Sequence, residues 1–128
     1  DAEAVRRPDK IDTATWVRII REAHDLGIRS TATIMYGHCE SVEDRARHLA
    51  ILREIQDDTR GFTEFVPLSF IHENTPLYRA GLARPGATGR EDILMVAVAR
   101  LFLLGETGEE DGGDNASFRR KRPRGDDV

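Results

Sequence analysis

Two β-rich segments separated by a long amphipathic segment constrain the fold of this 128-residue chain more than any other feature. Residues 28–36 and 62–70 are rich in β-branched and aromatic side chains, which favour a pleated strand. Residues 41–58 between them carry apolar side chains at a 3.6-residue period, which is typical of a helix packed on one face. Two strands joined by a helix of this length predict a right-handed βαβ unit with a parallel sheet.

A further helix is expected before the first strand, over residues 12–26. Asp12 or Thr13 can cap its start, and Gly27 can take the left-handed conformation that commonly follows a helix. The predicted buried face of this helix consists of apolar residues at helical spacing, namely Trp16, Ile19, Ile20 and Ala23.

The other two helix starts share a capping signal. Ser41 and Asp44 stand three residues apart, as in a capping box, and Thr88 and Glu91 repeat this spacing before an apolar helix that ends near residue 104. The class is therefore α/β. Two strands cannot close into a barrel, and parallel sheets are normally covered on both faces, so we expect an incomplete architecture.

Composition narrows the classes of partner. The formal net charge is −4, which gives no field that would attract nucleic acid to the whole chain. No apolar run approaches the ~20 residues that span a bilayer. The single cysteine, Cys39, excludes an internal disulfide and fits a reducing compartment. We expect a cytoplasmic protein that binds neither membrane nor nucleic acid.

Residues 105–128 differ in character from residues 1–104. An acidic run precedes the basic run Arg119–Arg124, and Phe118 is the only large apolar side chain besides the terminal Val128. Such a composition predicts a disordered, charged tail beside one folded part, residues 1–104. The alternative is an interaction protein that uses its basic tail to bind nucleic acid. The basic run contains no aromatic residues, which favours the solvated tail.

Polar residues gather where the first strand ends. Gly37 permits a positive φ or a close approach to the backbone, and His38 and Glu40 follow it. The carboxyl ends of parallel strands carry the sites of α/β barrels, so we expect a binding site here. A zinc site on His38 and Cys39, with His48 or His72 as a further ligand, is the weaker interpretation, because adjacent side chains in an extended turn diverge.

The second strand contains Pro67, which cannot donate to a strand ladder. It therefore favours a strand edge or a strand end, and a break there would leave main-chain groups free to bind a ligand. The Asn-Thr-Pro-Leu run at residues 74–77 is interpreted as a turn.

These residues resemble a known family. Residues 33–40 are similar to the GxIxGxxE element on the fifth strand of radical S-adenosylmethionine barrels, with Thr33 and Met35 in place of the first Gly and the Ile. Residues 66–77 are similar to the sixth strand. Three runs, residues 32–38, 61–68 and 96–101, resemble the tyrosine-using subunits of 7,8-didemethyl-8-hydroxy-5-deazariboflavin (FO) synthase. The resemblance extends from about Asp9 to Leu104.

The resemblance implies a partial (β/α) barrel, roughly strands five and six with flanking helices, from a radical S-adenosylmethionine transferase. This family joins a 4-hydroxybenzyl unit from tyrosine to 5-amino-6-(D-ribitylamino)uracil in deazaflavin biosynthesis. The resemblance assigns no catalytic residue. It implies that S-adenosylmethionine is bound, mainly at its adenine end, by Met35, Tyr36, Gly37, His38, Glu40, Val66, Pro67 and Leu68.

Two menaquinone-pathway enzymes, aminofutalosine synthase and the futalosine cyclase, share the Gly-His-x-Glu turn and provide the second interpretation. They usually carry Phe-Ile-Pro where this chain has Phe-Val-Pro, and they tend to lack the preceding Thr-Glu pair.

The chain also departs from the family. The family holds a 4Fe-4S cluster on a CxxxCxxC loop, which these 128 residues do not contain, and one cysteine cannot replace three thiolates. We therefore expect a fragment, inactive by itself, whose missing barrel portion would have to come from elsewhere.

Overall fold

The computed structural model describes residues 10–104 and 116–117. The elements follow in the order α1 (Thr13–Asp25), β1 (Ser30–Tyr36), α2 (Val42–Thr59), β2 (Phe62–Ser69), α3 (Pro76–Arg79), α4 (Gly89–Leu104) and β3 (Ala116–Ser117). The three long helices and the two long strands confirm the elements predicted from the sequence. The short helix α3 occupies part of the expected turn. The remainder of the predicted charged tail lies outside the described residues.

β1 and β2 pair in parallel, as predicted, with Ile34 opposite Pro67 and Met35 opposite Leu68. The sheet order is β1-β2-β3, so β1 lies at one edge of the described sheet. β3 was not predicted, and it pairs antiparallel with β2 at Glu64 and Phe65 only. The α/β class is thus confirmed, with one parallel strand pair.

Pro67 lies inside β2 rather than at a strand end, and the strand continues past it to Ser69 without a break. The Phe70 N–H donates to the Tyr36 carbonyl of β1 at 2.8 Å. Because main-chain groups alternate in direction along a strand, the Pro67 nitrogen points away from β1. The missing N–H therefore costs the β1–β2 ladder nothing, which explains how β2 tolerates a proline.

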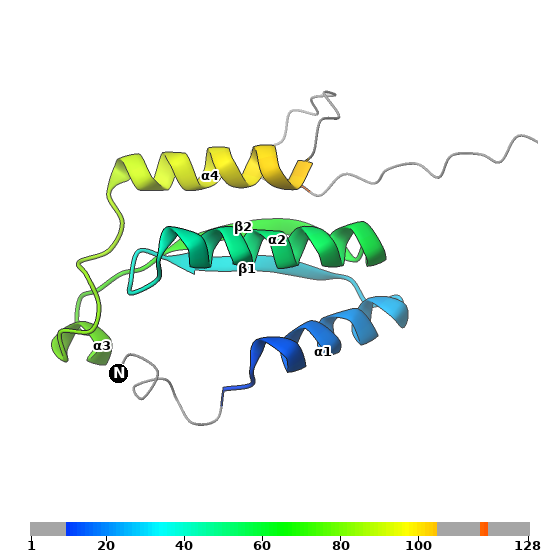
Figure 1. Ribbon diagram of the computed structural model, residues 1–128, viewed down its shortest axis with the longest axis horizontal. Coiled ribbons are helices and arrows are strands. Elements are labelled where there is room, and N and C mark those ends of the chain that lie inside the picture. The colour runs from blue at the N-terminus through cyan, green and yellow to red at the C-terminus, as the bar shows by residue number, and fades with distance from the viewer. Residues whose placement is uncertain (1–9, 105–115, 118–128) are drawn as a thin grey trace, which may run out of the picture.

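The core lies between one face of the sheet and the helices α2 and α4 (Figure 1). Alternate residues of β1 point into it, and Leu52 and Ile55 of α2 are almost completely buried. The buried apolar residues are Ala32, Ile34, Tyr36, Leu49, Leu52, Ile55, Phe62, Phe65, Met95 and Ala99. Trp16, Val17 and Ile20 of α1 pack against the margin of this core, whereas Ile19 of the predicted buried face is 44% exposed.

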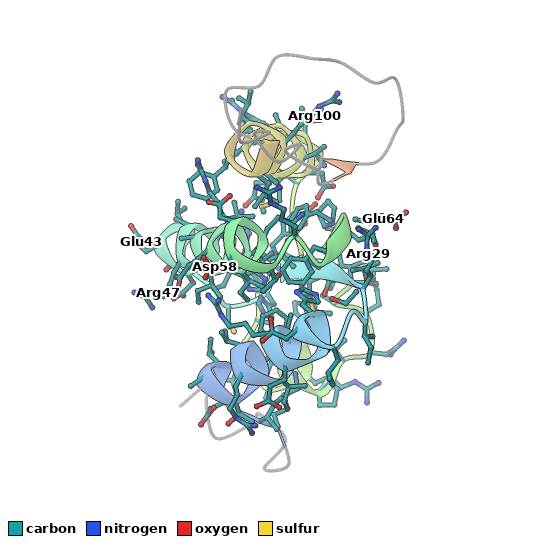
Figure 2. The ribbon with its side chains drawn as sticks, turned by 90° about the vertical axis from the view of Figure 1, so that its right-hand side faces the viewer. Arg29, Glu43, Arg47, Asp58, Glu64 and Arg100 are labelled. Carbon is teal, nitrogen blue, oxygen red and sulfur yellow. The ribbon has the colours of Figure 1, made fainter. Side chains whose placement is uncertain are left out.

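The opposite face of the β1–β2 pair carries no helix in the part of the chain that the structure describes. Figure 2 shows α2 on one side of the strands and the labelled Glu64 side chain on the other. Met35 is 52% and Leu68 43% exposed on this side. We call it the open face, and the strand register assigns to it Thr31, Thr33, Met35, Glu64, Val66 and Leu68. A parallel sheet is stable when both faces are covered, so this face can accept a ligand or further protein.

His24 connects α1 to the start of β1 and the end of α2. Its Nδ1 lies 2.7 Å from Thr59 Oγ1 and its Nε2 lies 2.9 Å from Ser30 Oγ. The Thr59 hydroxyl donates to the Ile55 carbonyl, so its oxygen can only accept from His24, and Nδ1 carries the proton. In the neutral imidazole Nε2 then accepts a hydrogen bond from the Ser30 hydroxyl. The imidazole also packs against Gly61, where a Cβ would overlap the ring.

Candidate functional site

The turn at residues 37–40 follows β1 at the carboxyl end of the parallel strands. Gly37 has a φ of +92°, which confirms the predicted need for glycine. A Cβ at this position would lie 2.7 Å from the Ala87 nitrogen, so the loop before α4 closes directly on the turn. Figure 1 shows α3 and the starts of α2 and α4 at this same end of the sheet.

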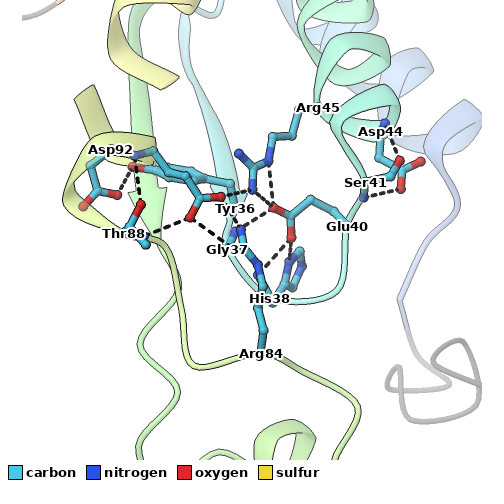
Figure 3. A network of polar contacts seen from close by, with 11 residues as sticks. Tyr36, Gly37, His38, Glu40, Ser41, Asp44, Arg45, Arg84, Thr88 and Asp92 are labelled. Carbon is cyan, nitrogen blue, oxygen red and sulfur yellow. Dashed lines mark hydrogen bonds and ion pairs between the residues drawn. The ribbon is translucent and has the colours of Figure 1, made fainter. Parts of the chain in front are cut away.

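The Glu40 carboxylate holds this turn together (Figure 3). One oxygen accepts the Gly37 N–H at 2.6 Å and the Arg45 Nε–H at 2.8 Å. The other accepts the His38 N–H at 2.9 Å and contacts His38 Nδ1. Burial opposes ionisation of Glu40, but the hydrogen bonds from Gly37, His38 and Arg45 outweigh it and lower its pKa to about 2. Glu40 is therefore an anion whose oxygens already have protein donors.

A chain of ion pairs connects Glu40 to α4. Arg45 Nη2 lies 2.6 Å from a Glu40 oxygen and 3.4 Å from Glu91 Oε1. Glu91 also accepts two hydrogen bonds from Arg84, at 2.7 and 3.0 Å, and one from the Thr88 N–H at 2.9 Å. The hydrogen bonds from Arg84 and Thr88 lower the pKa of Glu91 to about 2. We call Arg84, Glu91, Arg45 and Glu40 the ion-pair chain.

Two further contacts connect the same elements. The Tyr36 hydroxyl donates to Asp92 of α4 at 2.7 Å, and burial together with this bond raises the pKa of Tyr36 to about 12. The Arg84 main-chain N–H donates to the His38 carbonyl at 3.1 Å. The end of β1, the turn and the start of α4 are thus fixed to one another by several independent bonds.

The eight residues predicted to bind a cofactor lie in the two neighbouring strands and the turn that follows β1. The side chains of Met35, Val66 and Leu68 belong to the open face. Tyr36 points the other way, into the core, so only its main chain is available on that side. Pro67 stands opposite Ile34 and shares its orientation. The remaining three, Gly37, His38 and Glu40, form the turn.

Sequence reasoning did not identify four residues of this site, Arg45, Arg84, Glu91 and Asp92. The sequence indicates for Glu91 only a role in a capping box with Thr88, which the structure confirms in both directions. Its second role depends on where the loop after α3 brings Arg84. Neither spacing nor composition carries that information.

A pocket of about 420 Å³ opens at the free edge of β1, between the start of α1 and α2. Its lining includes Trp16, Thr33 and His48, and none of the predicted site residues. His48 Nε2 lies 2.9 Å from the Thr33 carbonyl, on the side of β1 away from β2. The imidazole thus occupies a position at which a neighbouring strand would pair, which connects this pocket to the strand edge.

The residues weighed for zinc do not form a metal-binding group among the described residues. His38 contacts Glu40, and Cys39 is exposed. Within residues 10–104 and 116–117, no three His, Cys, Asp or Glu side chains are grouped closely enough to hold a metal ion. No helix within those ranges has the length and apolar character needed to cross a membrane.

Comparison with known proteins identifies close relatives, although no protein-family model matches the chain. It is 82% identical over 103 residues to the 5-amino-6-(D-ribitylamino)uracil–L-tyrosine 4-hydroxyphenyl transferase of Methanoculleus marisnigri, covering 80% of this chain and 28% of the relative. Identity to the Methanopyrus kandleri protein of the same name is 58% over 96 residues, or 75% and 26% of the two chains. FO synthase of Mycobacterium leprae is 51% identical over 96 residues, covering 75% of this chain and 11% of the relative.

The chain spans little more than a quarter of the length of the first curated relatives that it matches. The predicted resemblance to the tyrosine-using FO synthase proteins is confirmed for that part, and the menaquinone-pathway interpretation is not favoured.

Proposed function

We propose that this chain is a segment of a 5-amino-6-(D-ribitylamino)uracil–L-tyrosine 4-hydroxyphenyl transferase, the tyrosine-using part of FO synthase. The whole enzyme would join a 4-hydroxybenzyl unit from tyrosine to 5-amino-6-(D-ribitylamino)uracil on the route to a deazaflavin cofactor. The observation that carries this proposal is the 82% identity, over 80% of the chain, to a protein that bears this name.

Within that enzyme, the segment would form two strands of a (β/α) barrel and part of the S-adenosylmethionine site. The open face offers the apolar side chains of Met35, Val66 and Leu68, on which a flat adenine ring can pack. The turn at residues 37–40 follows β1 at the carboxyl end of these strands, with its geometry fixed by Glu40. When bound there, S-adenosylmethionine would supply the radical chemistry of its superfamily.

The residues present do not fit the 4Fe-4S cluster. Cys39 is the only cysteine among the 128 residues, whereas clusters of this type are held by several thiolates. We therefore assign the cluster to a part of the enzyme that this chain does not contain. That missing portion of the barrel is the main partner that the proposal requires.

A segment chimera tests the proposal directly. It is the Methanoculleus marisnigri transferase in which the part corresponding to this chain is replaced by residues 10–104. After anaerobic loading with iron and sulfide, the chimera is expected to form the coupled product from tyrosine and 5-amino-6-(D-ribitylamino)uracil. We expect a rate within about tenfold of the unmodified enzyme, since a tenfold loss corresponds to only about 1.4 kcal/mol. A folded, cluster-loaded chimera that forms no product would overturn the proposal.

A further inference from the structure

We infer that Glu91 and Arg84 are positioning residues for the turn at residues 37–40, on which they act through Arg45 and Glu40. The inference rests on the proposed function, because it concerns the affinity of that turn for S-adenosylmethionine. The inference requires no contact between either residue and the cofactor.

The turn depends on the place of a single carboxylate. Glu40 accepts the N–H groups of both Gly37 and His38, at 2.6 and 2.9 Å, and so fixes the orientation of two successive peptide planes. Its side chain is 11% exposed, and its oxygens are occupied by protein donors. Glu40 therefore shapes the turn rather than reaching out to a ligand. A shift of this carboxylate would turn both of these peptide planes.

Arg45 sets the position of that carboxylate. It approaches Glu40 through both Nε and Nη2, and its guanidinium lies 5.4 Å from the centre of the Tyr36 ring. Its Nη2 also faces Glu91 at 3.4 Å. With 16% of the Arg45 side chain exposed, these charges are screened less than surface pairs. The guanidinium thus stands between two carboxylates, one in the turn and one on α4.

Glu91 balances the positive charge on both sides of it. Arg84 binds the same carboxylate through two nitrogens at 2.7 and 3.0 Å. If Glu91 lost its charge, Arg45 and Arg84 would be left with Glu40 as the only carboxylate of the ion-pair chain. Arg45 would then move relative to Glu40, and Arg84 would be released from α4. Because the Arg84 main-chain N–H donates to the His38 carbonyl, the release of Arg84 from α4 would also shift the turn.

The fold can survive this loss because other bonds hold α4 in place. The Tyr36 hydroxyl still donates to Asp92, and Met95 and Ala99 still pack in the core. Glu91→Gln also keeps an oxygen that can accept the Thr88 N–H. The expected effect therefore falls on the geometry of the turn rather than on the existence of the domain.

The test measures the dissociation constant of S-adenosylmethionine for the cluster-loaded segment chimera by anaerobic calorimetry. We expect Glu91→Gln to raise this constant about threefold to tenfold, the size of coupling found between groups in one polar network. Glu22→Gln is the matched control, because it removes the same charge from the exposed Arg18–Glu22 pair of α1. That control should leave the constant unchanged.

A double-mutant cycle with Glu40→Gln separates positioning from a general loss of stability. If Glu91 acts through Glu40, then Glu91→Gln should have little further effect in the Glu40→Gln background. Equal effects in both backgrounds would overturn the inference, as would an unchanged constant in Glu91→Gln alone. Should Glu91→Gln fail to fold, Arg84→Gln provides the same comparison, with a rise expected and an unchanged constant contradicting it. A folded, cluster-loaded parent chimera that does not bind S-adenosylmethionine would instead overturn the proposed function, and the inference with it.

Discussion

At Gly37 both the backbone conformation and the packing disfavour any residue that has a side chain. Its φ is +92°, and a Cβ would lie 2.7 Å from a main-chain nitrogen that belongs to Ala87. Gly81 has a φ of +70° but no atom within 4 Å of its ideal Cβ. An alanine at residue 81 would therefore have backbone strain alone, whereas an alanine at residue 37 would have both strain and a steric clash.

We predict that Gly81→Ala lowers the free energy of unfolding by roughly 1–2 kcal/mol, the cost of a left-handed alanine. Gly37→Ala should lose a further 1–3 kcal/mol, roughly, because the loop at Ala87 must also move. Urea unfolding of the 128-residue chain measures both values. Equal losses in the two variants would show that the approach of Ala87 does not restrict residue 37.

His24 should make the stability of the chain depend on pH. Burial lowers its pKa, so the folded state holds the imidazole neutral while the unfolded state titrates near the ordinary value of about 6.5. Below that pH the unfolded state binds more protons, and the folded state therefore loses stability as the pH falls. Burial lowers the pKa of His48 as well, in the same direction.

We predict that the free energy of unfolding decreases between pH 7.5 and pH 5.5, with a slope of at most about 1.4 kcal/mol per pH unit for each histidine. In His24→Gln the slope should be smaller, because the contribution of His24 is then lost. Urea titrations at several pH values measure the slopes. An identical pH dependence in the parent and His24→Gln would contradict the assignment of a neutral His24.

At the scale of elements, local sequence signals predicted most of the fold. Ser41 and Asp44 form the capping box in both directions, Asp12 caps α1, and Gly27 takes a positive φ. Each signal is decided by residues within one helical turn, so the sequence alone carries it. The parallel pairing also followed from local patterns, because a helix of this length between two strands leaves few alternatives.

The remaining features depend on contacts between distant segments. The ion-pair chain joins residue 40 to residue 91, and the close approach at Gly37 depends on the path of the loop after α3. The turn could be predicted as a site because its glycine and glutamate are adjacent in sequence. The guanidinium groups that fix it could not, since many arginines are available and spacing does not select among them. Helix α3 escaped prediction because four residues are too few for a periodic signal.

The edge of β1 should promote self-association of the isolated chain, although His48 occupies one position of that edge, at the Thr33 carbonyl. β1 stands at the end of the described sheet order, and Thr31 is exposed on the open face. A charged residue on such an edge disfavours pairing with a second strand. We predict that Thr31→Lys shifts the light-scattering mass toward that of the monomer, whereas Ala50→Lys, on the exposed side of α2, does not. A parent chain that is already monomeric and unfolds with several kcal/mol of stability would contradict this account.

At the scale of the whole molecule, the purified 128-residue chain should not cleave S-adenosylmethionine reductively. A cluster that delivers the electron needs several thiolates, and Cys39 is the only cysteine in the chain. We expect no 5′-deoxyadenosine above the level of a Cys39→Ala control after anaerobic treatment with iron, sulfide and reductant. Product that depends on Cys39 would show that the chain assembles a cluster by itself.

The central claim is that the open face and its adjoining turn hold the cofactor when the rest of the enzyme is present. Leu68 is 43% exposed on the open face, beside Met35, whereas Leu26 is 79% exposed at the end of α1, near the amino ends of the strands. Placing a carboxylate where an apolar ring should pack is costly, because the charge must be desolvated.

The most direct measurement compares Leu68→Asp with Leu26→Asp in the folded, cluster-loaded segment chimera, by titration with S-adenosylmethionine. We predict that Leu68→Asp raises the dissociation constant about tenfold or more, while Leu26→Asp leaves it within about twofold of the parent value. Dissociation constants that are the same for the parent and both variants would contradict the placement of the cofactor on this face.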